Sequence, residues 1–371
     1  MVSPVRDGNT LKSPKASIVI IVPHIPAYDT NAGDWRVWVL TQELSKKYNV
    51  FFCVINPKTN LKYKPKFEKY VKKIILLPDV AVFGKFLKFE NISTVIFEKY
   101  FGIDYSKLLG HFALATNFIV DTHDIDYLKA MRAGSKNILK IKQNESRLYK
   151  MADALVAISN FDKTKISALL NDKKPVFVIP TPTESNLKKF LPFQNRAGIA
   201  LWGYWGYPAN AAALKYFVSE IYPLVIKKLP NVKISILGAG AKAAKPLYKK
   251  TAMLHKENIK NIQTELSRYR VCAASIVWGS GVKKKIIDAF SAKTPIVTTP
   301  VGAEGISGIS KSIVCKNAET FADTLVRLYT DKVFWQKQSE CGYDIFVKNY
   351  TLKNFQKRLS RLLYLTKGHN K

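Results

Sequence analysis

A turn containing two glycines, followed by three consecutive lysines, is the part of the sequence best suited to bind a charged ligand. Residues 278–290 read Trp-Gly-Ser-Gly-Val-Lys-Lys-Lys-Ile-Ile-Asp-Ala-Phe and follow an apolar run typical of a buried strand. Three lysines at the start of a helix are unfavourable beside the positive end of the helix dipole, unless an anion is bound there. Free backbone N–H groups and lysine ammonium groups together bind phosphate. The alternative is a solvated helix in which Lys284 pairs with Asp288 four residues later.

His123 is the second candidate, because it closely follows the predicted strand 118–121. Ligands of parallel α/β sheets bind at the carboxyl ends of the strands, so a histidine in this place is suited to contact one. The alternative is a histidine with a structural role. Asp124 and Asp126, next along the chain, form an Asp-x-Asp pattern that can bind a metal ion. Since so short a pattern often arises by chance, we predict no metal at these residues.

Two halves of the chain show the same alternation of short β-branched runs and longer helical patterns. Such alternation predicts βαβ units and a parallel sheet in each half. The predicted strands are 17–22, 50–55, 74–77, 94–97, 118–121, 154–158 and 176–179 in the first half, and 198–202, 233–237, 272–277, 295–299 and 313–315 in the second. The predicted helices are 35–47, 135–151, 208–228 and a helical region from 318 to about 365.

These patterns predict two doubly wound α/β domains that face a central cleft. We expect a tail over residues 1–16, a first Rossmann-like domain over 17–180, a linker over 181–197, a second Rossmann-like domain over 198–350, and a C-terminal helix and tail over 351–371. Neither half carries Gly-x-Gly-x-x-Gly after its first strand, and there is no P-loop. A dinucleotide site or a P-loop nucleotide site is therefore not predicted.

The chain is strongly basic, with 59 Lys and Arg against 27 Asp and Glu and a net charge of +32. Such a surface attracts polyanions. A dense cluster at 62–73 consists of Lys62, Lys64, Lys66, Lys69, Lys72 and Lys73, interleaved with Tyr63, Phe67 and Tyr70. It fits either a solvated surface or peripheral contact with an anionic membrane. Arginine-rich tracts and aromatic platforms typical of RNA-binding modules are absent from the sequence, so no specific nucleic acid partner is predicted.

Targeting and cysteine patterns favour a cytoplasmic protein. The longest apolar run, about residues 16–23, is too short to span a bilayer. None of the four cysteines lies in a Cys-x-x-Cys spacing. We therefore expect structural thiols in a reducing compartment.

The segment around the lysines resembles the donor-binding motif of family-4-type, or group 1, retaining glycosyltransferases. The similar residues are 270–290 and 295–305, the latter reading Pro-Ile-Val-Thr-Thr-Pro-Val-Gly-Ala-Glu-Gly. Further similar segments follow in the family's order: 31–36, 120–128, 152–159, 203–210 and 217–225. The resemblance covers about residues 17–350.

The resemblance implies a GT-B enzyme that moves a sugar from a nucleotide diphosphate-sugar to a hydroxyl of a glycan, lipid-linked or protein acceptor. It implies retention of configuration and no metal or other cofactor. By match, Lys283 and Lys285 would hold the diphosphate, Asp288 the nucleotide ribose, and His123 would face the donor sugar as the catalytic residue. The other positions matched to the donor site are Gly33, Gly203, Gly281 and Thr299.

Four positions depart from the family pattern and bear on the choice of donor. Asp288 replaces a usual Glu, Ser280 stands where the pattern has its first Glu, Ser275 replaces Pro, and Lys293 replaces Gly. Two other functions remain compatible with the same fold: a nucleotide-sugar 2-epimerase, which needs no acceptor, and a non-enzymatic polyanion-binding protein. The net charge favours the latter, whereas the retained lysines and histidine favour the transferase.

Overall fold

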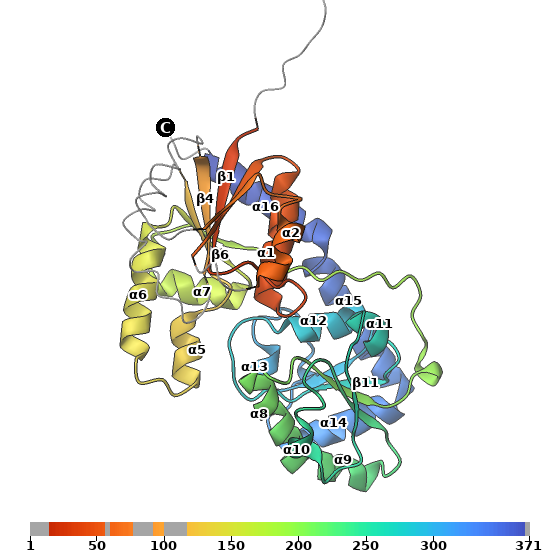
Figure 1. Cartoon of the computed structure of the whole chain (residues 1–371). Coiled ribbons are helices and arrows are strands. Elements are labelled where there is room, and N and C mark those ends of the chain that lie inside the picture. Colours follow the sequence, from red (N-terminus) through yellow and green to blue (C-terminus); the bar gives the residue numbers. More distant parts are fainter. Residues whose placement is uncertain (1–14, 56–59, 77–91, 100–116, 368–371) are drawn as a thin grey trace, which may run out of the picture.

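Two parallel sheets, each with its own helices, make up the protein (Figure 1). The structure is a computed structural model and describes residues 15–55, 60–76, 92–99 and 117–367. The first sheet has seven strands in the order β3-β2-β1-β4-β5-β6-β7, and the second has five in the order β10-β9-β8-β11-β12. The prediction of an α/β fold with two parallel sheets is confirmed.

The first domain is built around strands that are nearly all buried. Its strands are β1 (Ser17–Val22), β2 (Asn49–Val54), β3 (Lys73–Leu76), β4 (Ile92–Glu98), β5 (Phe118–Asp121), β6 (Ala154–Ala157) and β7 (Val176–Val178). Its helices among the described residues are α1 (Ala32–Ser45), α2 (Lys64–Phe67), α5 (Asp126–Arg132), α6 (Ile138–Met151) and α7 (Asn160–Leu169). β4 and β5 are neighbours in register, with Glu98 opposite Asp121, so their polar ends lie at one edge of the sheet.

The second domain repeats this arrangement on a smaller scale. Its strands are β8 (Ile199–Trp202), β9 (Ile234–Leu237), β10 (Leu254–Lys256), β11 (Val271–Ala274) and β12 (Ile296–Thr298). Its helices are α8 (Pro208–Tyr216), α9 (Tyr222–Lys228), α10 (Lys245–Tyr248), α11 (Ile262–Leu266), α12 (Lys284–Ser291), α13 (Pro300–Ala303), α14 (Ala318–Thr330) and α15 (Lys332–Asn349).

The structure differs from the predicted elements in three places. The predicted strand 313–315 is instead a 3₁₀ turn, Lys311–Ile313, followed by a single bridge between Val314 and Thr298. The predicted helix 208–228 contains a π-helical turn, Phe217–Ile221, just before Pro223, which lacks the N–H that a regular helix needs. The short edge strand β10 was missed because all three of its residues are exposed, which gives no alternation of apolar and polar side chains.

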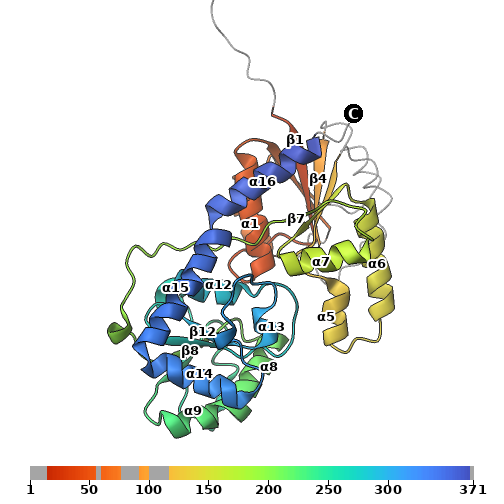
Figure 2. The ribbon, with the colours of Figure 1, turned by 180° about the vertical axis from the view of Figure 1, so that it is seen from behind.

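The C-terminal helix α16 (Leu352–Lys367) returns to the first domain (Figure 2). Phe355, Leu359, Leu362 and Leu363 form one face of this helix and are buried in the same core as Leu40 of α1. The chain thus crosses between the domains twice, once through the segment after β7 and once from α15 to α16.

The lysine cluster at 62–73 has its aromatic residues turned inward. Tyr63 and Phe67 are buried, with edge-to-face contacts to Tyr28 and Trp38 respectively, whereas Lys62, Lys66 and Lys69 are exposed. Tyr63 and Phe67 are therefore not available to enter a membrane interface. No helix among the described residues is long and apolar enough to cross a membrane.

Candidate functional site

The turn that carries the lysines joins β11 to α12 in the second domain. We call residues 275–283 the glycine turn. Gly279 and Gly281 adopt φ angles of 129° and 68°, a region that favours glycine. Lys283 occupies the N-cap of α12 without a side-chain capping bond, so the first N–H groups of the helix have no capping side chain at this residue. This geometry matches the strand, turn and helix start that anions favour.

Lys283 and Lys285 bond only to neutral oxygens. Lys283 Nζ donates to the carbonyls of Ser280 and Gly281 at 3.1 and 2.5 Å, and Lys285 Nζ donates to Asn210 Oδ1 at 2.8 Å. Lys285 Nζ also lies 5.8 Å from the centroid of the Trp202 ring. Within the described part of the chain, no carboxylate forms an ion pair with either ammonium.

The surroundings of Lys283 and Lys285 lower the pKa of both side chains. Burial and the neighbouring Lys283 lower the pKa of Lys285 to about 8. Burial also lowers the pKa of Lys283, although Asp124 and Glu304 partly oppose this. Two partly buried ammonium groups bonded to neutral oxygens form a site suited to bind an anion.

Two further polar atoms near these lysines lack a partner. Ser280 Oγ in the glycine turn and Trp202 Nε1 at the end of β8 are buried and make no hydrogen bond to any described residue. Buried polar groups are normally paired, so unpaired ones at one place indicate a ligand or water.

Three other predicted donor residues of the second domain are Gly203, Thr299 and Asp288. A Cβ on Gly203 would lie 3.0 Å from Asn210 Nδ2 and 3.4 Å from Lys285 Nζ, so Gly203 borders the lysine site. Thr299 caps α13, accepting from Gly302 N at 3.0 Å. Asp288 Oδ1 accepts from Lys284 at 2.6 Å and from Gln263 at 3.1 Å. The intrahelical pair that we gave as the alternative is therefore present.

Two predicted glycines lie near the boundary between the domains, Gly33 in the first domain and Gly281 in the second. Gly33 lies in the first turn of α1, and the nearby Trp35 ring is 6.0 Å from the ammonium of Lys284. Gly281 leaves room for Asp124 of the first domain, whose Oδ1 would be only 2.5 Å from a Cβ at this position.

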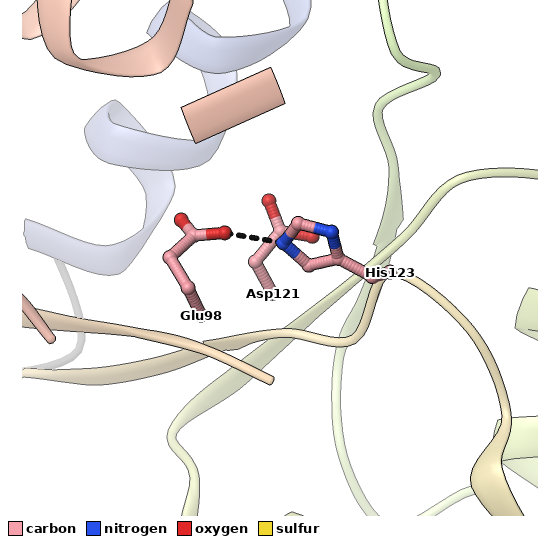
Figure 3. A group of neighbouring side chains, drawn as sticks. All are labelled: Glu98, Asp121 and His123. Atoms are coloured by element: carbon pink, nitrogen blue, oxygen red, sulfur yellow. Dashed lines mark hydrogen bonds and ion pairs between the residues drawn. The ribbon is translucent and has the colours of Figure 1, made fainter. Parts of the chain in front are cut away.

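His123 follows β5 in a left-handed backbone conformation, with φ 53°. Its Nε2 lies 2.5 Å from Oε2 of Glu98, whose side chain is fully buried at the end of β4 (Figure 3). Asp121, beside them, is paired with Arg36 of α1 at 2.7 Å. A non-glycine residue in this backbone region is strained, and such strain is often found at functional sites.

The proton balance of this group favours a charged histidine. Burial lowers the pKa of His123, but the hydrogen bond and the negative charge of Glu98, together with Asp121, outweigh it and raise the pKa above its ordinary value. Burial and Asp121 raise the pKa of Glu98, and His123 partly offsets this. The short contact between His123 and Glu98 is therefore a charge-assisted hydrogen bond in which the histidine donates.

The carboxylates of the first domain are neutralised by protein cations. Glu98, Asp121 and His123 bring their ligand atoms within 4.8 Å of one another, an arrangement that could hold a metal ion. However, Arg36 already donates to Asp121 and supplies the positive charge there. In the Asp-x-Asp pattern, Asp124 pairs with Lys129 at 3.0 Å and Asp126 with Lys99 at 2.9 Å. These carboxylates are therefore already paired with cations of the protein.

Sequence reasoning missed several residues of the site. Glu98 and Asn210 contact predicted residues, and Arg132 and Glu304 pair across the domain boundary. The available signal for Glu98 was the polar pair Glu98-Lys99 at the end of an apolar strand next to the strand before His123. A cavity of about 890 Å³ lined by α15, Asn160, Ser307 and Gly308 contains none of the predicted residues.

Comparison with solved structures identifies the class of fold. The chain is similar to sucrose-phosphate synthase from Thermosynechococcus elongatus, with a TM-score of 0.74, 13% identity, and coverage of 95% of this chain and 100% of that one. It is similar to a glycosyltransferase from Rickettsia africae, with a TM-score of 0.68, 14% identity, and coverage of 96% and 99%. It is also similar to Anabaena HepE crystallised with UDP and glucose, with a TM-score of 0.67, 12% identity, and coverage of 94% and 99%. The fold is GT-B, as predicted.

The second domain matches a known family. Residues 198–331 match the model described as "Glycosyl transferases group 1". The resemblance drawn from the glycine turn is confirmed at this level. A curated protein from Klebsiella pneumoniae, described as an uncharacterized 44.6 kDa protein in the cps region, is 25% identical over 157 residues. The match spans 39% of this chain and about 40% of that relative's length.

Proposed function

We propose that this protein is a glycosyltransferase that moves a sugar from a nucleotide diphosphate-sugar to an acceptor hydroxyl. One observation carries the proposal: Lys283 and Lys285 are partly buried ammonium groups at a helix start, and no carboxylate of the described residues pairs with them. A diphosphate supplies the missing negative charge and accepts hydrogen bonds from the first N–H groups of α12. The unpaired Ser280 Oγ and Trp202 Nε1 offer further hydrogen-bonding groups for the same ligand.

The chemistry follows from leaving-group stabilisation. When the glycosidic bond to the diphosphate breaks, negative charge grows on the phosphate that leaves, and prearranged cations stabilise it without reorganisation. The lysines and the helix start take the place of a divalent ion, so the proposed reaction needs no metal. Retention of configuration, which the family resemblance implies, fits attack from the face of the departing phosphate, which takes the acceptor proton.

The donor and acceptor classes are proposed from related structures. HepE was crystallised with UDP and glucose, and a Staphylococcus aureus TarM variant with UDP and α-GlcNAc-glycerol. We infer that the donor is a UDP-sugar and that the acceptor is a glycan or a glycan carried on a lipid or protein. The exposed lysines at 62–73 support electrostatic contact with an anionic membrane that would carry such an acceptor.

Calorimetric titration with UDP, GDP and ADP tests the site. We expect UDP to bind the unmodified protein and expect K283A/K285A to weaken binding at least hundredfold, because each lost charged contact is worth roughly 1.5–3 kcal/mol. The matched control is K284A. It also removes one positive charge at the start of α12, but Lys284 is paired with Asp288. Equal UDP affinity of the double variant and the unmodified protein would contradict the site.

The two alternatives predict different outcomes. A 2-epimerase would convert its UDP-sugar without an acceptor. A polyanion-binding protein, which the charge of +32 favours, would bind UDP no more tightly than other anions of equal charge. Turnover that requires an acceptor separates the transferase from both.

A further inference from the structure

The glycine turn is anchored at its start, where Ser275 donates to the carbonyl of Ala213 and Ile276 accepts from Thr299, and its later residues need a separate support. Gly279 and Gly281 have positive φ angles, and between β11 and α12 there is no regular secondary structure. Lys283 donates back to the carbonyls of Ser280 and Gly281 in the turn, and a diphosphate would compete for these hydrogens. Some other group must therefore hold the turn when Lys283 turns to a ligand.

Arg132, the last residue of α5 in the first domain, makes that contact. Its Nη1 donates to the carbonyl oxygen of Gly279 at 2.6 Å. The same guanidinium forms a bidentate ion pair with Glu304, with Nη1 to Oε1 at 2.8 Å and Nη2 to Oε2 at 2.6 Å. A planar guanidinium held by two carboxylate oxygens is restricted in orientation, so its bond to Gly279 is directed rather than incidental.

A second contact comes from the same segment of the first domain. Asp124 Oδ1 fits against Gly281, and Asp124 is itself held by Lys129 at 3.0 Å. Asp124 directly follows His123, and Arg132 follows eight residues later at the end of α5. One stretch of the first domain therefore carries the histidine and two side chains that touch the glycine turn.

We propose that Arg132 is a positioning residue: from the first domain, it fixes the glycine turn of the second domain in the shape that directs Lys283 and Lys285 at the nucleotide diphosphate. The inference rests on the proposed function of the lysine site. It follows that the second domain completes this site only when the first domain is docked against it. Donor binding and domain docking then favour one another, because each stabilises the arrangement that the other needs.

The test measures UDP affinity by calorimetry and amide hydrogen exchange of the peptide covering the glycine turn. For R132A we expect UDP affinity to fall about tenfold, the size of one lost charged contact, and exchange at the turn to accelerate. The matched control is R147A, because Arg147 is an exposed arginine of α6 in the same domain. It should change neither quantity.

A charge-reversal pair separates positioning from simple attraction between the domains. The double variant R132E/E304R restores an ion pair, but a carboxylate at the first position cannot donate to the Gly279 carbonyl. We expect UDP affinity to stay as weak as in R132A. Recovery of unmodified affinity in the double variant would show that only the ion pair matters and would overturn the inference.

The outcomes also distinguish this inference from the proposed function. If K283A/K285A loses UDP binding while R132A changes neither affinity nor exchange, the lysine site stands and the role of Arg132 is wrong. If K283A/K285A binds UDP normally, the site itself is wrong and the inference falls with it. Melting temperatures of all variants, measured alongside, identify any variant that fails to fold, for which R132K replaces R132A.

Discussion

The charged residues near His123 in the first domain and the lysines of the second domain differ in how their charges are paired. In the first domain, Glu98 pairs with His123 and Asp121 pairs with Arg36, so the charges balance within the protein. In the second domain, Lys283 and Lys285 bond only to carbonyl and amide oxygens. The difference shows where the charge of a ligand would matter. The group around His123 has its charges paired within the protein and is suited to orient a substrate, whereas the two lysines are suited to bind an anion.

The largest expected loss of UDP affinity comes from giving Lys285 a carboxylate partner within the protein. N210D places a carboxylate where Lys285 now contacts a neutral amide at 2.8 Å. The new charge would pair with Lys285 and repel a diphosphate by about 2–4 kcal/mol, so we expect UDP affinity to fall roughly hundredfold. The melting temperature should not fall in parallel, since the lysine gains a partner.

N210A is the control for this change, because it removes the same amide without adding charge. It should weaken UDP binding far less than N210D. Similar losses in both variants, measured by calorimetry, would mean that the amide itself binds the ligand and that the missing counter-charge is not the decisive feature.

The second effect is a pH dependence of donor binding. Since the pKa of Lys285 is lowered to about 8, the free protein loses this charge as the pH rises through 8, and UDP affinity should fall between pH 8 and 10. The linked effect on folding has the opposite direction. The unfolded chain keeps its proton up to an ordinary lysine pKa of about 10.4, so this group adds stability as the pH rises from about 8 to 10.

K285R tests that assignment, because arginine stays charged over the whole range. We expect its UDP affinity to depend less on pH than that of the unmodified protein, with the residual dependence due to Lys283. Identical slopes of affinity against pH in the two proteins would assign the titration to another group.

A smaller effect is expected in the first domain. E98Q removes the negative charge that raises the pKa of His123, so this pKa should fall toward the ordinary value of about 6.5. The pKa of His123 is raised in the folded protein, so its protonation stabilises the fold at pH values below the ordinary histidine pKa. This contribution is lost as the pH rises through the folded-state pKa. E98Q should therefore reduce the free energy of unfolding most at low pH. The ¹⁵N shifts of the His123 ring against pH measure the change.

Turnover of the same variants distinguishes a catalytic His123 from a structural one. We expect H123A to lower the turnover number more than UDP affinity, and E98Q to shift the acid limb of the pH–rate profile. Unchanged turnover in H123A with the true acceptor would leave the pair a structural element at the end of β5.

The smallest expected effect is that of a chelator. Activity should be the same with and without EDTA, because protein cations neutralise Asp124, Asp126 and Asp121. Loss of activity in EDTA, restored by manganese or magnesium, would instead assign a metal to the Glu98, Asp121 and His123 group.

Local patterns in the sequence were sufficient for most of the fold. The strands before His123 and before the glycine turn are runs of buried apolar residues, and the glycines and lysines that follow are adjacent in the chain. Such features depend on neighbouring residues only, so their spacing can be read directly. The family resemblance then ordered them into a GT-B fold.

The features that the sequence did not reveal depend on distant residues. Arg132 and Glu304 are 172 positions apart, and nothing near either residue indicates the other. Lys293, which stands where the family has Gly, adopts a φ of 51°, and its ammonium lies between the rings of Phe190 and Tyr343 at 5.1 and 4.7 Å. Those rings come from the segment after β7 and from α15, so only the folded chain shows how the substitution is accommodated.

The return of α16 to the first domain sets the order in which the protein can be completed during synthesis. Phe355, Leu359, Leu362 and Leu363 belong to the first domain's core, although a ribosome makes them after the whole second domain. The domain that emerges first therefore keeps an apolar face over α1 and β4 uncovered until α16 has been made, while the second domain can finish its own sheet earlier. Nascent chains stalled before residue 352 should consequently recruit chaperones to the first domain.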